Sequence, residues 1–261
     1  MLLAIDVGNT NTVFALVEEG EILHRWRIST HAQRTSDEYM VWLSQLMEVA
    51  SADGRRINRG DVNRIIIASV VPPTLFNLVR LAQTWFNVEP RIVTKDLDLG
   101  IGVDVPNPSE VGADRLVNSA AAYHEHGDGL ILLDFGTATT FDVILNGSYS
   151  GGIIAPGINL AVDALYSASA QLPRVAVAPP QNGRALAKGT VDAMQSGIFY
   201  GYIGLIEGLC TRLKQEAGRD MKVIATGGLA PIFDKHTDVI SLVDTDLTVR
   251  GLMLIEQRNP F

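Results

Sequence analysis

A short turn motif occurs twice in this chain, about half a chain length apart, and it restricts the fold more than any other feature. The first copy reads Asp6-Val7-Gly8-Asn9-Thr10 and the second reads Asp134-Phe135-Gly136-Thr137-Ala138. In both copies an aspartate and an apolar residue precede a glycine. A repeat of this period indicates a duplicated domain, because solenoid repeats are only about 20–50 residues long.

Each motif begins what reads as a three-stranded antiparallel meander, with aliphatic and β-branched residues between turn formers. Asn146-Gly147 is a strong hairpin signal between the last two strands of the second meander. The strands predicted for the two meanders are 2–7, 12–17 and 21–29, then 130–134, 139–145 and 148–154. Helices are predicted at 35–50, 73–86, 156–170, 190–217 and 247–257, and further strands at 64–70, 90–93 and 221–225.

A meander followed by alternating helices and strands, in both halves, predicts an α/β protein of two similar domains with a cleft between them. The length of 261 residues and the 47% hydrophobic content suit two domains of about 100–150 residues. No linker composition marks the boundary. Symmetry places it near Leu116, which gives domains 1–116 and 117–261.

Charge and cysteine content restrict the partners and the compartment. The formal net charge of −8 argues against nucleic-acid binding, and it requires an anionic substrate to be held by local donors or metal. Cys210 is the only cysteine, so no intrachain disulfide forms. With no signal peptide or membrane span in the pattern, we expect a cytoplasmic protein.

The repeated turn has the chemistry of a phosphate site. A tight turn between strands directs several backbone N–H groups into one concavity, and Gly8 permits a positive φ and a close approach. An aspartate at the strand end, Asp6, can hold Mg²⁺ through water. The alternative for either copy is an ordinary hairpin turn, and Asp134 can likewise be a structural turn residue.

A third glycine turn, Thr226-Gly227-Gly228, follows the strand predicted at 221–225. Adjacent glycines there would let a flat nucleoside approach the backbone closely. The alternative is a plain turn between a strand and a helix.

The segment Asn107–Arg115 is the most unusual stretch of the chain. Ser109 is a suitable N-cap for a following helix, and Asp114 with Arg115 can present a carboxylate and a guanidinium together. The alternative is a surface charge pair, which contributes little.

With these motifs in this order, the chain resembles the type III pantothenate kinases of the acetate and sugar kinase/heat-shock protein 70/actin superfamily. The fold expected from the resemblance is therefore the actin-like ATPase (ribonuclease H-like) type, in two similar domains. The resemblance covers nearly the whole chain and rests on Asp6–Thr10, Glu110–Arg115, Asp134–Thr140, Gly151–Gly157, Leu172-Pro173 and Thr226–Gly228.

The resemblance implies ATP-dependent phosphorylation of pantothenate to 4'-phosphopantothenate, the first step of coenzyme A biosynthesis. Asp114 is the implied catalytic base, and Asp134 is the implied ligand of a monovalent cation, K⁺ or NH₄⁺, used alongside Mg²⁺. The implied ATP-binding residues are Asp6, Val7, Gly8, Asn9, Thr10, Asn11, Thr12, Val13, Thr137, Gly227 and Gly228. The implied pantothenate-binding residues are Val105, Gly112, Ala113, Asp114, Arg115 and, from the other subunit of a homodimer, Thr190.

Val105 is a departure from the family, which often has a substrate-contacting tyrosine two residues before the Asn-Pro of this segment. One pantothenate contact is therefore in question, but the phosphoryl chemistry is not.

The helix predicted at 190–217 carries Gly197, Gly201, Gly204 and Gly208 on one face. Glycine costs up to about 1 kcal/mol relative to alanine in a helix, so a flat face predicts close packing of another helix. That helix either belongs to the same subunit or is its copy in a second subunit.

Two other functions fit part of the pattern. Another kinase or phosphatase of the superfamily would share the two Asp-x-Gly turns, but the Gly-Ala-Asp-Arg segment argues against it. A non-catalytic, nucleotide-binding relative would be expected to lack a phosphate turn or the base, yet Asp6, Asp114 and Asp134 are all present.

Overall fold

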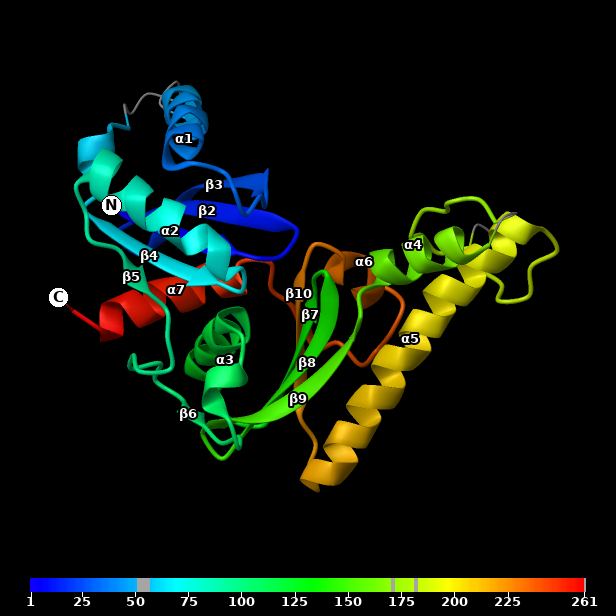
Figure 1. Ribbon diagram of the computed structural model, residues 1–261. Helices are drawn as coiled ribbons and strands as arrows, with labels where there is room; N and C mark the ends of the chain where they lie inside the picture. The colour runs from blue at the N-terminus through cyan, green and yellow to red at the C-terminus, as the bar shows by residue number, and fades with distance from the viewer. Residues whose placement is uncertain (51–56, 170–171, 181–182, 261) are drawn as a thin grey trace. The chain divides into compact units, whose positions relative to one another are not determined.

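The computed structural model describes residues 1–50, 57–169, 172–180 and 183–260. The chain divides into two compact units, and the strands form two sheets (Figure 1). The first unit comprises Met1–Ile101, Pro106–Ala121 and Thr248–Phe261, and the second comprises Gly102–Val105 and Ala122–Leu247. Leu116, the boundary expected from symmetry, falls inside the second segment of the first unit. Both units are discontinuous in sequence, because Pro106–Ala121 and the C-terminal segment both belong with the N-terminal segment.

The first sheet has the strand order β3-β2-β1-β4-β5. β1 pairs antiparallel with β2 and parallel with β4, so the predicted meander is extended by parallel strands. The strands are β1 (Leu2–Val7), β2 (Asn11–Glu18), β3 (Glu21–Ser29), β4 (Arg64–Ser69) and β5 (Arg91–Ile92).

One face of the first sheet packs against α1 (Ser36–Ala50) and α2 (Pro72–Arg80). Alternate β1 residues, among them Leu3 and Ile5, point into this core because side chains of a strand alternate between faces. The helix predicted at 73–86 is α-helical only to Arg80, and a π-helical turn, Leu81–Phe86, completes it.

The second sheet has the order β11-β10-β7-β8-β9-β6. Apart from the added edge strand β6, it repeats the connectivity of the first sheet, and β7 and β8 repeat the burial patterns of β1 and β2. The prediction of a duplicated α/β domain is therefore confirmed. The strands are β6 (Gly102–Val103), β7 (Leu130–Phe135), β8 (Ala138–Leu145), β9 (Ser148–Pro156), β10 (Lys222–Gly227) and β11 (Leu242–Val243).

The core of the second unit contains a row of aromatic rings between sheet and helices. Phe233 stacks on Phe135, with ring centroids 5.1 Å apart, and on Phe199, at 5.5 Å. The remaining helices are α3 (Ala113–His126), which begins in the first unit, α4 (Ile158–Ala168), α5 (Thr190–Ala217) and α6 (Ala230–Asp234). The predicted helix 156–170 begins two residues late, and its last predicted residue lies outside the described residues.

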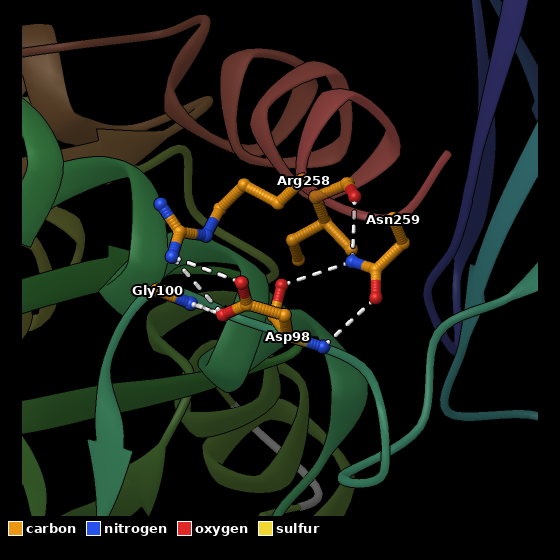
Figure 2. Close-up of polar contacts among 5 residues, drawn as sticks. Asp98, Gly100, Arg258 and Asn259 are labelled. Carbon is orange, nitrogen blue, oxygen red and sulfur yellow. Dashed lines mark hydrogen bonds and ion pairs between the residues drawn. The ribbon is translucent and has the colours of Figure 1, made fainter.

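The C-terminal helix α7 (Leu247–Arg258) lies on the opposite side of the first sheet from α1 (Figure 1). Figure 2 shows how its end is fixed: Arg258 Nη2 donates to both carboxylate oxygens of Asp98, at 3.1 and 3.0 Å. Asn259 exchanges two hydrogen bonds with the backbone of Asp98, both at 2.9 Å. The Gly100 N–H, followed by Arg258, holds the pKa of Asp98 below its usual value. These contacts explain why the C-terminus belongs to the first unit.

Among the described residues, no helix has both the length and the apolar character needed to cross a membrane.

Candidate active site

The first turn motif connects the end of β1 to the start of β2 in the first sheet. Asp6 is the penultimate residue of β1 and half-buried, whereas Asn9 and Thr10 are exposed at the tip. The Gly8 N–H donates to Asn11 O at 3.0 Å and closes the turn. Gly8 does not use the positive φ that glycine permits, since it is not among the residues in that region. Its lack of a side chain matters instead because an added Cβ would lie 3.2 Å from Asn11 O.

Thr30, just after β3, supports this turn from the side. Its hydroxyl donates to Gly8 O at 2.7 Å, and its N–H donates to Thr10 O at 2.9 Å. The Thr12 hydroxyl lies 2.9 Å from that of Thr30 and, because the Thr30 proton is used, acts as the donor. The buried Thr12 hydroxyl is thus part of the internal support of the turn.

The second turn motif has the same design, but only Gly136 and Thr137 separate β7 from β8. The Gly136 N–H donates to Ala138 O at 3.0 Å. Gly157, at the start of α4, lies directly against the turn: an added Cβ would overlap Thr137 O and would lie 2.9 Å from Gly136 O. No larger residue fits at Gly157 without moving the turn.

Asp134 in β7 lies beside Gly227 in the parallel strand β10. Gly227 has a φ of +89°, and an added Cβ would lie 2.6 Å from Phe135 O and 2.8 Å from Asp134 Oδ1. By contrast, an added Cβ at Gly228 would meet nothing within 4 Å. The two adjacent glycines therefore differ: Gly227 is required by the space around Asp134, and Gly228 is free to approach a ligand.

Asp114 lies in the first turn of α3. Gly112 lies between Asp114 and Val70, the residue after β4. An added Cβ on Gly112 would be 2.5 Å from Asp114 Oδ1 and 3.3 Å from Val70 Cγ1. The Val70 N–H in turn donates to Val7 O at 3.1 Å. Within the first unit, Val70 thereby connects the carboxylate of Asp114 to the strand that carries the first turn.

The environment of Asp114 favours its neutral form. Burial raises the pKa of the Asp114 carboxyl, against the opposing effects of the Arg115 N–H, which donates to Oδ1 at 2.8 Å, and of the Arg115 guanidinium. A shifted carboxyl pKa at a half-buried site is typical of an acid–base residue, although structural groups also show such shifts.

The segment before α3 differs from the sequence expectation in one respect. Ser109 lies in a short 3₁₀ turn, Pro108–Glu110, and α3 begins only at Ala113, so Ser109 does not cap it. The first carbonyl to accept a helical hydrogen bond is that of Gly112, from the Leu116 N–H at 3.2 Å. Residue 112 thus starts the helix through its carbonyl, and its being glycine leaves room for Asp114.

The other expected substrate residues lie in the second unit. Val105 is half-buried, and its Cγ1 would be 3.9 Å from a Cβ added to Gly151. Thr190 is exposed at the start of α5. The structure thus brings Gly112 and Asp114 together at Val70, which is bonded to Val7, the residue after Asp6, and it brings Asp134, Thr137 and Gly227 together at the ends of β7 and β10.

Three supporting residues, Thr30, Val70 and Gly157, were not assigned a role from the sequence. Gly157 belongs to the Gly151–Gly157 motif, but the motif alone does not reveal that this glycine contacts the turn of the preceding hairpin. Thr30 and Val70 each follow a strand that neighbours the first motif, which is the one signal that would have pointed to them.

The glycine face of α5 is open. An added Cβ at Gly197, Gly201, Gly204 or Gly208 would meet nothing within 4 Å among the described residues. Beside Gly197 and Gly201, residues of α4 and α5 line an open apolar pocket of about 520 Å³. Packing of a helix of the same subunit against this face is therefore not observed in the part of the chain described.

The fold is that of the actin-like ATPases and sugar kinases. A ROK hexokinase from Thermus thermophilus superimposes with a TM-score of 0.50 at 13% identity, over 97% of both chains. This class is defined here by two β-sheets of equivalent connectivity, each of which carries an aspartate-anchored turn.

The sequence comparisons specify the family. The family model for type III pantothenate kinase matches residues 2–212. The type III pantothenate kinase of Rhodospirillum rubrum is 53% identical over 99% of both chains. That of Acidiphilium cryptum is 50% identical over all of this chain and 96% of the relative. The chain belongs to the type III pantothenate kinase family.

The function expected from the sequence is confirmed by this membership. The chain is a kinase that phosphorylates pantothenate with ATP, a step of coenzyme A biosynthesis. The alternatives of a sugar-directed kinase or a non-catalytic relative are not supported, because the full-length relatives share half of their residues with this chain.

Proposed function

We propose that Asp114 is the catalytic base that accepts the proton of the pantothenate hydroxyl, and that both aspartate-anchored turns hold the phosphates of ATP. In this proposal the turn within Asp6–Val13 contacts the phosphates through its exposed tip, Asn9 and Thr10, while buried Val7 and Thr12 support it; Thr137 contacts the phosphates from the second turn, and Gly227 and Gly228 lie near the nucleoside. Pantothenate is bound by Val105, Gly112, Ala113 and Arg115, with Thr190 contributed by a second subunit. Arg115 orients the Asp114 carboxylate and offsets negative charge.

The observation that supports this proposal is the arrangement of Gly112, Val70 and Val7. It holds the Asp114 carboxylate against the end of β4, next to the strand that carries the first phosphate turn. A primary alcohol is a very weak acid, so a carboxylate does not ionise it in the ground state. In the loose transition state of phosphoryl transfer the proton leaves late, and positioning of the base matters more than its strength.

Bound cations complete the proposal. The Asp134 carboxylate and the Phe135 carbonyl lie together beside Gly227, where a larger side chain would fill the space. Two oxygen ligands of this kind suit K⁺ or NH₄⁺. Asp6 suits Mg²⁺ held through water, because Mg²⁺ keeps several waters and needs only one or two protein carboxylates beside the phosphates. The divalent ion, when bound, neutralises charge on the phosphates.

The pH dependence of kcat/KM for pantothenate tests the role of Asp114, because this ratio reports the pKa values of the free enzyme. The base is active when ionised, and its pKa is raised by burial, so activity should fall on the acid side at a pH above the ordinary aspartate value of about 3.9. The residual activity of Asp114→Asn should lack this acid limb. An identical limb in the variant would assign the titration to another group.

We further propose that the enzyme is a homodimer that uses the glycine face of α5. Leu165 of α4 lines the apolar pocket beside this face and is 39% exposed, and Leu160 and Tyr166 of the same helix are exposed at 54% and 48%. Exposed apolar surface around a pocket is typical of an interaction site. Thr190 lies on the same helix, exposed at its first turn, in a position suited to a contact with the partner.

Gly201→Glu should convert the dimer to a monomer, because a charged side chain would stand where the second helix packs. The substitution leaves the monomer intact, since an added Cβ at Gly201 meets nothing within 4 Å. Gly60→Glu is the matched control, as Gly60 is equally open. Mass from light scattering is the measurement, and a monomeric wild type would exclude the dimer.

We also propose a cytoplasmic location, which is consistent with a metabolic kinase whose single cysteine is buried and cannot form an intrachain disulfide.

A further inference from the structure

Tyr202 is a buried residue of α5 whose hydroxyl contacts β8, the strand that follows the second turn motif, and β9, the strand paired with it. It lies 2.5 Å from Thr139 Oγ1 on β8 and donates to Pro156 O on β9 at 2.7 Å. A tyrosine hydroxyl carries one proton, so the Thr139 hydroxyl must be the donor in the first of these bonds. Burial raises the pKa of Tyr202, which keeps this proton in place at neutral pH.

These two contacts are made where the β8–β9 ladder ends. Its last paired positions are Ala138 with Pro156 and Thr139 with Ala155. Thr137 immediately precedes this end on β8, and Gly157 immediately follows it on β9. The Tyr202 hydroxyl therefore joins the two strands within two residues of the Thr137–Gly157 contact.

The Thr137–Gly157 contact leaves little tolerance for movement. Gly157 lies so close to the carbonyls of Thr137 and Gly136 that not even a methyl group fits between them. A relative shift of β8 and β9 would therefore move the turn that carries Thr137. Because hydrogen-bond donors must lie within about 2.7–3.2 Å of a phosphate oxygen, a small shift would weaken binding.

We propose that Tyr202 is a positioning residue for ATP, which fixes the Gly136–Thr137 turn through its paired contacts with Thr139 and Pro156. This inference rests on the proposed role of Thr137 in binding the phosphates. Tyr202 also lines the open apolar pocket beside Gly197 and Gly201. The same side chain thus connects the phosphate turn to the face of α5 proposed to hold the second subunit.

The test is nucleotide affinity in Tyr202→Phe, which removes one oxygen and keeps the ring. Titration calorimetry with a non-hydrolysable ATP analogue and Mg²⁺ should show a Kd raised about three- to tenfold, as expected for the loss of a buried hydrogen-bond pair. KM for ATP should rise in parallel, while KM for pantothenate changes less than twofold. Tyr200→Phe is the matched control, because Tyr200 packs on Phe199 and its hydroxyl makes no hydrogen bond with the described residues.

A second pair of variants separates positioning from general stability. Thr139→Val should raise the Kd of the analogue as Tyr202→Phe does, the double variant should be no worse than either, and Thr139→Ser should restore the wild-type value. A lower thermal midpoint with unchanged nucleotide affinity in Tyr202→Phe and Thr139→Val would overturn the inference. A wild type that does not bind the analogue would instead contradict the proposed ATP site itself.

Discussion

Asp114→Asn should lose most of kcat, by about 10²–10⁴-fold, with only a modest change in KM for pantothenate. The amide keeps the shape of the carboxylate and its acceptor for the Arg115 N–H, but it cannot take the substrate proton. Steady-state kinetics with saturating ATP measures both constants. Glu110→Gln is the control, since Glu110 is an exposed acid of the same segment that bonds to Asn107 at 3.0 Å. Wild-type turnover by Asp114→Asn would refute the assignment of the base.

The same variant should be more stable than the wild type at neutral pH. Because the pKa of Asp114 is raised on folding, the carboxyl favours the folded state below the ordinary aspartate pKa, and this contribution is lost as the pH rises through the folded-state pKa. An asparagine does not titrate, so the thermal midpoint of Asp114→Asn should exceed that of the wild type at pH 7. The difference should shrink towards pH 4. A lower midpoint at pH 7 would show that the ionised carboxylate is stabilising.

Gly227→Ala should abolish most of the activity, whereas Gly228→Ala should leave a folded and active enzyme. An L-residue at a φ of +89° is strained by about 1–2 kcal/mol, and the Cβ would press on Phe135 O and Asp134 Oδ1. The Asp134 carboxylate would be displaced from the oxygen set proposed for the monovalent cation. Gly228 differs by a single position and has open space for a Cβ.

Activity in K⁺, NH₄⁺ and Na⁺ buffers distinguishes the two variants. The wild type and Gly228→Ala should be active in K⁺ and NH₄⁺ and nearly inactive in Na⁺. Gly227→Ala should show a low rate in all three salts, with far-UV circular dichroism confirming that it is folded. Equal wild-type rates in the three salts would remove the cation from the proposal.

The local elements of this fold could be predicted because short-range chemistry determines them. Strand β3 and helix α5 have the predicted bounds, Glu21–Ser29 and Thr190–Ala217, because turn residues or glycines delimit them. The tertiary features could not be predicted in the same way. Nothing local to α7 indicates that Arg258 and Asn259 bind Asp98, a long-range contact that ties the C-terminal segment to the first unit.

The residues of the candidate site show the same difference between local and tertiary features. Asp6, Asp114 and Asp134 are recognisable because each stands in a motif with a glycine nearby. The residues that position them are not, because their roles arise from neighbouring strands and helices. Gly8 illustrates the difference: its place in the motif was predicted, but its conformation depends on the hydrogen bond to Asn11 and not on a positive φ.

The most direct test of this account is to identify the product that the purified chain forms from ATP, Mg²⁺, K⁺ and pantothenate. Mass spectrometry should show 4'-phosphopantothenate appearing in equal amounts with ADP, at a rate well above that of parallel reactions with glucose or acetate as the acceptor. Phosphorylation of a sugar in preference to pantothenate, or release of ADP without phosphopantothenate, would contradict the account.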